Sequence, residues 1–229
     1  MARAGDTIES PVSGARIVFR KTARDTNGEL LQYDEFLKVG GRGPREHVHR
    51  YQEERFEILS GTARIGVRGQ ERDYGAGETV SVPAGTRHVW GNPGEEEVHV
   101  IIEFRPALRV ETFLETYFGL QKDGKVNPKS GLPNPFQRAV ISREYEDEVY
   151  LARPPLFVQR VFSGLLAPIG KLLGYEARYP EYSGPEEPLA RRREGEGPSA
   201  ASGAMRWRIV VGAAVAAVGL LLLRRRVRF

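Results

Sequence analysis

The stretch His47–Gly61, HVHRYQEERFEILSG, carries the strongest indication of fold in this chain of 229 residues. Two histidines one residue apart precede a glutamate and an apolar–polar alternation that ends at a glycine. On a β-strand, residues i and i+2 point to the same face, so His47 and His49 project together. If Glu54 points inward, the alternation also turns Phe56 inward. The stretch therefore predicts a hairpin that offers two imidazoles and one carboxylate to a single interior.

A second stretch, Gly77–Asn92 (GETVSVPAGTRHVWGN), supplies a further imidazole. A strand ends there at a Pro-Ala-Gly turn, and His88 follows three residues after the glycine. Together the two stretches hold three of the four histidines of the chain. They also match both halves of the cupin signature, whose fixed positions fall on Gly41, His47, His49, Glu54 and Gly61, and on Gly77, Pro83, Gly85, His88 and Asn92. The chain thus resembles a single-domain cupin, with one barrel over residues 15–106.

This resemblance implies that His47, His49, Glu54 and His88 bind one divalent metal inside a jelly-roll β-barrel. Three imidazoles and a carboxylate suit Fe(II), Mn(II), Ni(II), Cu(II) or Zn(II), and ligand type alone does not choose among them. The chain has no cysteine, so thiolate ligands and disulfides are excluded. The alternative to a metal site is that these histidines are hydrogen-bonded core residues. Some cupins have indeed lost their metal.

Three other residues are weighed for the same interior. His99 is expected at the surface or beside the ligands rather than among them. Trp90 shares the face of His88, where it either walls a ligand pocket or packs in the core. Arg45 is expected to be solvated, although an arginine at the barrel mouth could meet an anionic ligand.

The rest of the pattern is mainly β, with helices towards the C-terminus. Closely spaced apolar–polar alternations without a helical period between them favour an antiparallel sandwich or barrel. They are ARIVFRKT, ELLQYDEFLKV, ERFEILSG, TARIGVRG, ETVSVPAG and EVHVIIEF. Helices are expected from Val110 to about Gly119, from Asn134-Pro135 to about Tyr145, and over 156–173, where Pro168 should kink or split the helix. We expect these helices to cover the barrel or to build a dimer interface.

Four regions follow from these patterns: a barrel domain over 1–106, a helical extension over 107–175, a flexible linker over 176–204 and a membrane anchor over 205–229. The formal net charge of +4 comes from the last region, because 204–229 contains six arginines and no acid. The remainder has 28 basic and 30 acidic residues, a net charge of −2. No basic stripe with interleaved aromatics occurs elsewhere, which argues against nucleic-acid binding.

The anchor prediction rests on Ile209–Leu223, fifteen residues that are all apolar or glycine. As a helix they would extend roughly 22 Å, against a hydrocarbon core of about 30 Å. Trp207 and the flanking arginines reach towards headgroups and recover part of the missing length. A buried core helix is the alternative. Because MARAGDTIES lacks the apolar stretch of a secretory signal, we expect a single-pass protein with a cytoplasmic barrel, although the arginines at 224–226 oppose that orientation.

Cupins include dioxygenases, decarboxylases, isomerases, storage proteins and ligand sensors, so the resemblance does not determine a reaction. The favoured interpretation is a membrane-anchored, dioxygenase-like enzyme acting on a small organic molecule, with Glu54 as ligand and catalytic base. The alternative is a non-catalytic cupin that binds or senses a small ligand. An open polar pocket would favour catalysis, and a barrel mouth closed by the C-terminal helices would favour binding. A homodimer is a further candidate assembly.

Overall fold

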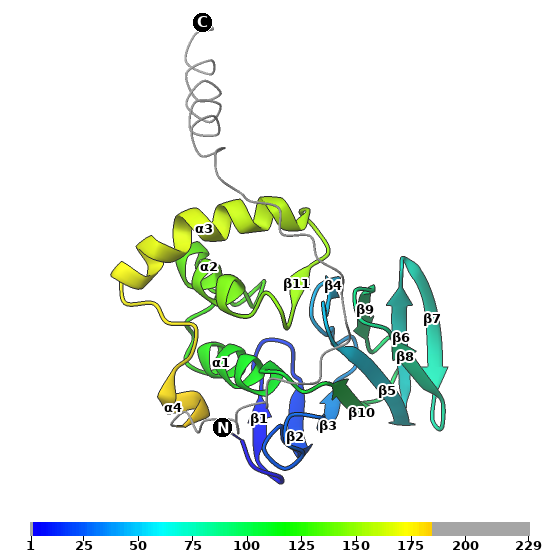
Figure 1. Ribbon diagram of the computed structural model, residues 1–229. Helices are drawn as coiled ribbons and strands as arrows, with labels where there is room; N and C mark the ends of the chain where they lie inside the picture. Colours follow the sequence, from blue (N-terminus) through cyan, green and yellow to red (C-terminus); the bar gives the residue numbers. More distant parts are fainter. Residues whose placement is uncertain (1, 185–229) are drawn as a thin grey trace, which may run out of the picture. The chain divides into compact units, whose positions relative to one another are not determined.

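In the computed structural model, which describes residues 2–184, two antiparallel sheets face each other (Figure 1). The first sheet has the strand order β1-β2-β3-β10-β5-β8, and the second has the order β11-β4-β9-β6-β7. The mainly β, cupin-like fold class is therefore confirmed. The strands are β1 (Thr7–Glu9), β2 (Arg16–Lys21), β3 (Leu31–Leu37), β4 (His47–Val48), β5 (Glu53–Ser60), β6 (Thr62–Val67), β7 (Gln70–Gly75), β8 (Thr79–Val82), β9 (Arg87–Gly91), β10 (Val98–Arg105) and β11 (Tyr150–Leu151).

The core lies between the two sheets and follows the alternation of the strands. Along β5, Glu54, Phe56 and Ile58 are buried, while the residues between them are partly exposed. The inward orientation predicted from the sequence is thus confirmed. Phe56 and Ile58 join β3 and β10 side chains such as Tyr33 and Ile102 in one apolar cluster. Glu54 is a carboxylate placed among these apolar side chains.

All six predicted strands are present, and the structure adds five short or polar ones. Strand β7, QERDYG, is mostly exposed, so it has no apolar face that a periodicity could reveal. Strands β1, β4 and β11 have only two or three residues each. Their pairing depends on neighbours distant in sequence: β11 pairs with β4 through Tyr150↔Val48 and Leu151↔His47. The C-terminal extension therefore contributes a strand to the second sheet, next to the histidines.

Two helices agree with the sequence pattern. Helix α1 (Val110–Lys122) runs beyond Gly119, and its Val110, Leu114 and Phe118 pack against the core between the sheets. Helix α2 (Pro135–Glu144) begins as predicted. The Asn134 side chain accepts hydrogen bonds from the backbone N–H groups of residues 136 and 137, at 3.0 and 3.1 Å.

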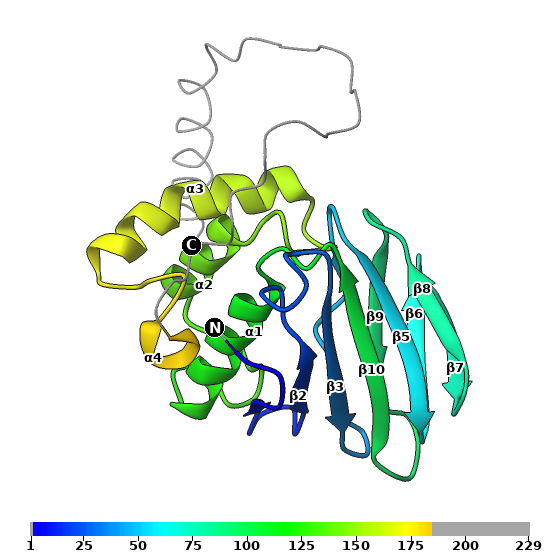
Figure 2. The same cartoon turned by 60° about the horizontal axis from the view of Figure 1, so that its bottom comes forward.

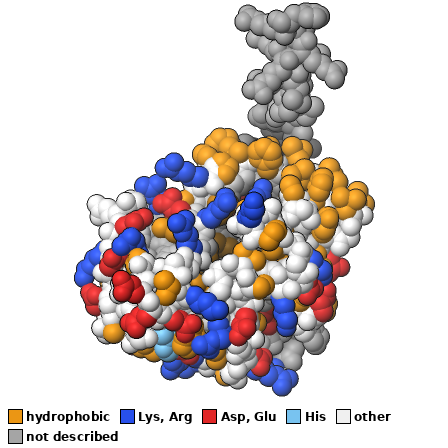
Figure 3. Space-filling model, turned by 180° about the vertical axis from the view of Figure 1, so that it is seen from behind, with side chains coloured by type: hydrophobic (Ala, Val, Ile, Leu, Met, Phe, Trp, Pro, Cys, Tyr) orange, Lys and Arg blue, Asp and Glu red, His pale blue; other side chains and the backbone are white. Residues whose placement is uncertain are grey.

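Helix α3 (Leu156–Leu172) differs from the prediction in two ways. It is continuous through Pro168 rather than split. Most of its large apolar side chains do not cover the barrel but are exposed (Figure 3), while Leu166 packs against α2. The buried side of α3 consists instead of Ser163, Ala167 and Gly170, small residues that let the helix approach α2 closely.

Residues 176–184 are folded, which corrects the predicted start of the linker. Ala177, Tyr179 and Tyr182 pack around Leu120, and the short helix α4 (Pro180–Ser183) follows α3 (Figure 2). The segment is polar in overall composition, but its tyrosines provide enough apolar surface to pack against the helices. The predicted membrane segment, 205–229, lies outside the described residues. Within 2–184, no helix combines the length and apolarity needed to cross a bilayer.

Candidate metal centre

The four predicted ligands converge between the sheets. His47 on β4 lies directly opposite His88 on β9, and His49 follows β4 on the same side as His47. Glu54 reaches them from β5 of the other sheet, so the predicted hairpin is wrong: β4 and β5 do not pair with each other. The four side chains are only 1–6% exposed, and one ligand atom from each lies within 4.8 Å of all the others. The structure thus brings together all four residues singled out in the sequence.

Main-chain carbonyl oxygens hold all three rings. The Nδ1–H groups of the histidines donate to the carbonyl oxygens of Arg45 for His47 (2.9 Å), Glu148 for His49 (2.7 Å) and Thr86 for His88 (3.1 Å). A carbonyl oxygen can only accept, so each Nδ1 carries a proton and each neutral ring presents the lone pair of its Nε2. All three Nε2 atoms face the shared centre. This is the arrangement that a metal-binding histidine requires, with one nitrogen fixed and the other free.

The same arrangement is electrostatically unfavourable without a cation. Nε2 of His47 lies 3.0 Å from Nε2 of His49, which lies 3.4 Å from Oε2 of Glu54. Glu54 Oε2 and His88 Nε2 touch as an ion pair, and neither atom has another hydrogen-bond partner among the described residues. The Nε2 atoms of His47 and His49 also face this carboxylate oxygen at short range. Such a buried group is costly unless a positive charge lies within it, either a proton on His88 or a metal ion in its place.

The protonation equilibria reflect this crowding. Burial lowers the pKa of His47 and, against the opposing charge of Glu54, that of His49; His88 lowers the pKa of both further, so both rings are neutral. Burial also disfavours a charge on His88, but the Glu54 carboxylate outweighs it and raises the His88 pKa. Burial raises the pKa of Glu54, whereas His88 and His49 more than offset this and hold it at about 2. Glu54 is therefore an anion at neutral pH.

These residues fit a divalent transition metal. Around an ion with bonds of about 2.1 Å, ligand atoms at right angles lie about 3 Å apart, close to the observed spacing of the His47, His49 and Glu54 atoms. Three imidazole nitrogens and one carboxylate oxygen suit iron, manganese, nickel, copper or zinc. The donor set does not choose among them.

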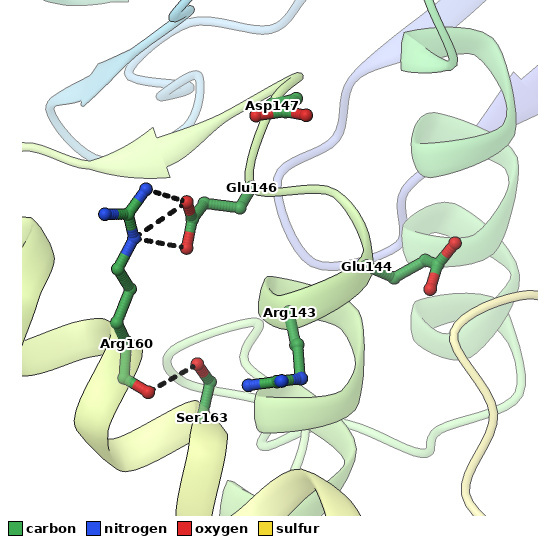
Figure 4. Close-up of a pocket in the computed structure, with 6 residues that line it drawn as sticks. All are labelled: Arg143, Glu144, Glu146, Asp147, Arg160 and Ser163. Atoms are coloured by element: carbon green, nitrogen blue, oxygen red, sulfur yellow. Dashed lines mark hydrogen bonds and ion pairs between the residues drawn. The ribbon is translucent and has the colours of Figure 1, made fainter. Parts of the chain in front are cut away.

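A segment of the C-terminal extension, Tyr145–Leu151, packs behind the His49 ring, and we call it the cover. Its Glu148 carbonyl binds His49, and its Glu148 carboxylate, only 3% exposed, is held by Arg109 at 2.7 Å. Arg109 also binds the Glu144 carboxylate at 2.7 Å. The described surface pockets lie elsewhere. One of them is open and polar, and its lining comes from α2, α3 and the Glu146–Asp147 turn (Figure 4).

The other candidate residues lie outside the ligand set. His99 binds Asp34 at 2.7 Å and stacks on Phe36, away from the centre. Trp90 is buried in the apolar core near Phe56, as expected of core packing. Arg45 is exposed and contributes its carbonyl rather than its side chain.

A further buried carboxyl group between the sheets, that of Glu35, was not predicted from the sequence. It lies on β3 between Tyr33 and Leu37, on the inward face. Burial, and then the charge of Glu54, raise the pKa of Glu35 to about 8. The alternation of LQYDEFL carried the signal, since it places Glu35 in phase with the apolar residues 31, 33 and 37.

The chain is similar to one protein family, to curated proteins and to solved structures. A family model described as the cupin domain matches residues 34–103. The probable oxidoreductase virH of Hypocrea virens is 31% identical over 64% of the chain and 70% of its own length. An oxidoreductase of Arthrobotrys oligospora is 26% identical over 64% of the chain, which spans only 62% of that protein. A solved RmlC-like cupin from Shewanella frigidimarina is 21% identical over 48% of the chain and 94% of its own, with a TM-score of 0.39.

Proposed function

Because this chain belongs to the cupin superfamily, we propose that it is a metal-dependent oxidoreductase of the dioxygenase type, acting on a small organic molecule. The observation that carries the proposal is the convergence of three Nε2 lone pairs and one carboxylate on a single buried point. The two relatives named as oxidoreductases support the reaction class. The fold alone would not, since one fold hosts many reactions.

His47, His49, Glu54 and His88 would hold the metal. When bound, a divalent transition metal would supply a Lewis acid or a redox centre. The carbonyls of Arg45, Thr86 and Glu148 fix the rings, so the ligand atoms need little rearrangement. Glu54 is the proposed base as well as a ligand, since its carboxylate is ionised at neutral pH.

The surroundings of the centre exclude bulk water. The Phe104 ring lies 4.8 Å from the His49 ring, and Phe56 packs beside His88. The ligands are almost inaccessible, and the cover, Tyr145–Leu151, packs against one of them, His49. In this proposal a substrate enters when the cover moves. An apolar, covered site would protect reactive species from water during turnover.

The same cover favours a second candidate, a non-catalytic cupin that holds a metal or small ligand. If Tyr145–Leu151 does not open, the centre has no route for a substrate. In that case the metal would stabilise the junction between β4 and β11, and ligand binding would be the function of the protein.

Dioxygen uptake separates the two candidates. The full chain would be loaded in turn with Fe(II), Mn(II), Ni(II), Cu(II) and Zn(II), and uptake measured with a panel of small organic acids and phenols. We expect uptake with at least one metal and substrate, and its loss in Glu54→Gln and His49→Ala. Metal-loaded protein that takes up no dioxygen with any of them would favour the non-catalytic candidate.

We also propose that residues 205–229 anchor the protein in a membrane as a single pass, with the cupin domain on the cytoplasmic side. The support is the sequence itself: fifteen apolar or glycine residues, 209–223, between clusters of arginine.

A further inference from the structure

Helix α3 presents its large apolar side chains to the outside. Phe157, Leu165 and Leu172 are 69%, 65% and 89% exposed, values typical of side chains in contact with solvent. On an ideal helix, the exposed apolar residues fall within an arc of about 160°. We call this set the outer face of α3; it consists of Phe157, Val161, Phe162, Leu165, Ile169, Leu172 and Leu173. Figure 3 shows apolar side chains gathered along this edge of the molecule.

Packing against α2 fixes this orientation. Ser163, Ala167 and Gly170 form the buried side of α3. A Cβ atom on Gly170 would lie 2.8 Å from Cγ2 of Val140 and 3.0 Å from the carbonyl oxygen of Phe136. The two helices are therefore too close for a larger residue at this contact. Helix α3 cannot turn its outer face inward without losing its contact with α2.

The polar border of the outer face is cationic. Helix α3 contains Arg160 and Lys171 and no acidic residue. Arg143 of α2 extends towards α3 (Figure 4) and has no ion-pair partner within residues 2–184. The nearby acids are already paired, Glu146 with Arg160 at 2.6 Å and Asp147 with Arg50 at 3.6 Å. Because Glu146 neutralises Arg160, the cations left beside the outer face for an anionic partner are Lys171 and Arg143.

We propose that the outer face of α3 lies in the interfacial region of a bilayer that contains anionic phospholipids. An apolar helix face bordered by arginine and lysine is the pattern of helices that lie in the plane of a membrane. The inference rests on the proposed anchor: beyond the described residues the chain carries a second apolar run, 209–223, with six arginines around it. Anchoring would bring α3 to the same surface.

Charge disfavours the two other occupants of the outer face. A second copy packed antiparallel about Leu165 would place Lys171 near Arg160 of that copy. Docking of 209–223 would bring its flanking arginines towards the same two residues. Like charges at such a contact lower affinity. An anionic lipid surface has no such conflict.

The chain has no cysteine, so a single introduced thiol can report on α3 alone. A polarity-sensitive nitrobenzoxadiazole dye would be attached to full-length Leu165→Cys and, as a matched control, to Lys129→Cys in the exposed loop before α2. Each is mixed with phosphatidylcholine–phosphatidylserine vesicles and with pure phosphatidylcholine vesicles. Quenching of Trp207 by brominated lipid reports separately on the anchor, because Trp90 is buried in the core.

We expect the dye at 165 to brighten and shift to the blue with the mixed vesicles, more than with phosphatidylcholine alone, and the dye at 129 to stay unchanged. An unshifted dye at 165 while Trp207 is quenched would refute the inference and leave the anchor intact. If Trp207 is not quenched either, the proposed anchor has failed as well. A blue-shifted dye without vesicles would also refute the inference. It would indicate a second copy if the shift depends on protein concentration, and residues 209–223 if it does not.

Discussion

At the scale of single residues, main-chain carbonyls determine what the histidines can do. The oxygens of Arg45, Thr86 and Glu148 accept from the three Nδ1–H groups, and a carbonyl does not titrate. The rings therefore keep their orientation across the physiological pH range, and proton exchange is confined to the Nε2 side. The carbonyls thus fix the position of each ring through Nδ1, while Nε2 is left for metal binding or proton transfer.

Glu35 makes the stability of the fold depend on pH. Its pKa is about 8 in the folded protein, against 4.5 as an ordinary glutamate, because burial and Glu54 disfavour its charge. Between these two pKa values the unfolded chain ionises Glu35 and the folded protein does not. The free energy of unfolding is therefore highest below pH 4.5 and falls as the pH rises to about 8. The loss is on the order of 3–5 kcal/mol in the free energy of unfolding. Glu35→Gln cannot ionise, so we expect it to be more stable than the wild type above pH 8.

Urea denaturation across this pH range checks the prediction. The exposed Glu53 on β5 provides a matched control, since Glu53→Gln should keep the wild-type pH dependence. If Glu35→Gln and the wild type lose stability in parallel, Glu35 is not the group responsible.

The four candidate ligands could be picked out from the sequence, but their supports could not. The match of His47–Gly61 and Gly77–Asn92 to the cupin signature implied the four side chains, although β4 and β5 lie in different sheets. The carbonyl that holds His49 belongs to residue 148, and no local pattern relates two residues 99 positions apart. Glu35 could have been found from its phase in β3.

At the scale of elements, the cover over the centre depends on one arginine. Arg109 holds the buried Glu148 carboxylate, and Glu148 is the residue whose carbonyl binds His49. Arg109→Ala would leave that carboxylate buried without its cation, at a cost of about 1–3 kcal/mol. We expect a bound metal to be lost to a chelator about tenfold faster or more. As a control, Arg64→Ala breaks an exposed pair with Asp73 and should leave the rate of metal loss unchanged. Equal rates in the wild type, Arg109→Ala and Arg64→Ala would contradict the role of the cover.

Two glycines of α3 allow a matched test of its packing. Gly170→Ala should destabilise the protein by about 1–3 kcal/mol, because its methyl group would overlap Val140 and the Phe136 carbonyl. Gly164→Ala meets only the Arg143 guanidinium at 3.5 Å, so it should stabilise α3 by up to about 1 kcal/mol. Urea denaturation of both variants measures the difference. Equal effects would mean that α3 does not pack against α2 as described.

Helix α3 also shows where periodicity fails. Its apolar stripe predicted the helix, but it did not predict whether the stripe faces the protein core or the outside. An apolar face indicates contact with an apolar surface and does not identify that surface. The small residues at 163, 167 and 170 were the relevant signal. They mark the side on which another helix approaches closely.

At the scale of the whole molecule, the proposed anchor predicts how the protein partitions. Full-length protein should remain with membranes in high salt and be released by detergent, because burial of apolar surface is not screened by ions. Leu221→Arg with Leu222→Arg should release it into the soluble fraction. Release of the wild type by salt alone would mean that the arginines bind a surface and that residues 209–223 do not insert.

The metal content of the purified full chain tests the central claim most directly. We expect close to one transition metal ion per chain in protein from metal-replete cells, measured by elemental analysis. His49→Ala and His88→Ala should lose most of it. His99→Ala should retain it, because His99 binds Asp34 outside the cluster. Metal-free wild-type protein, or equal loss in His99→Ala, would contradict a metal centre at His47, His49, Glu54 and His88.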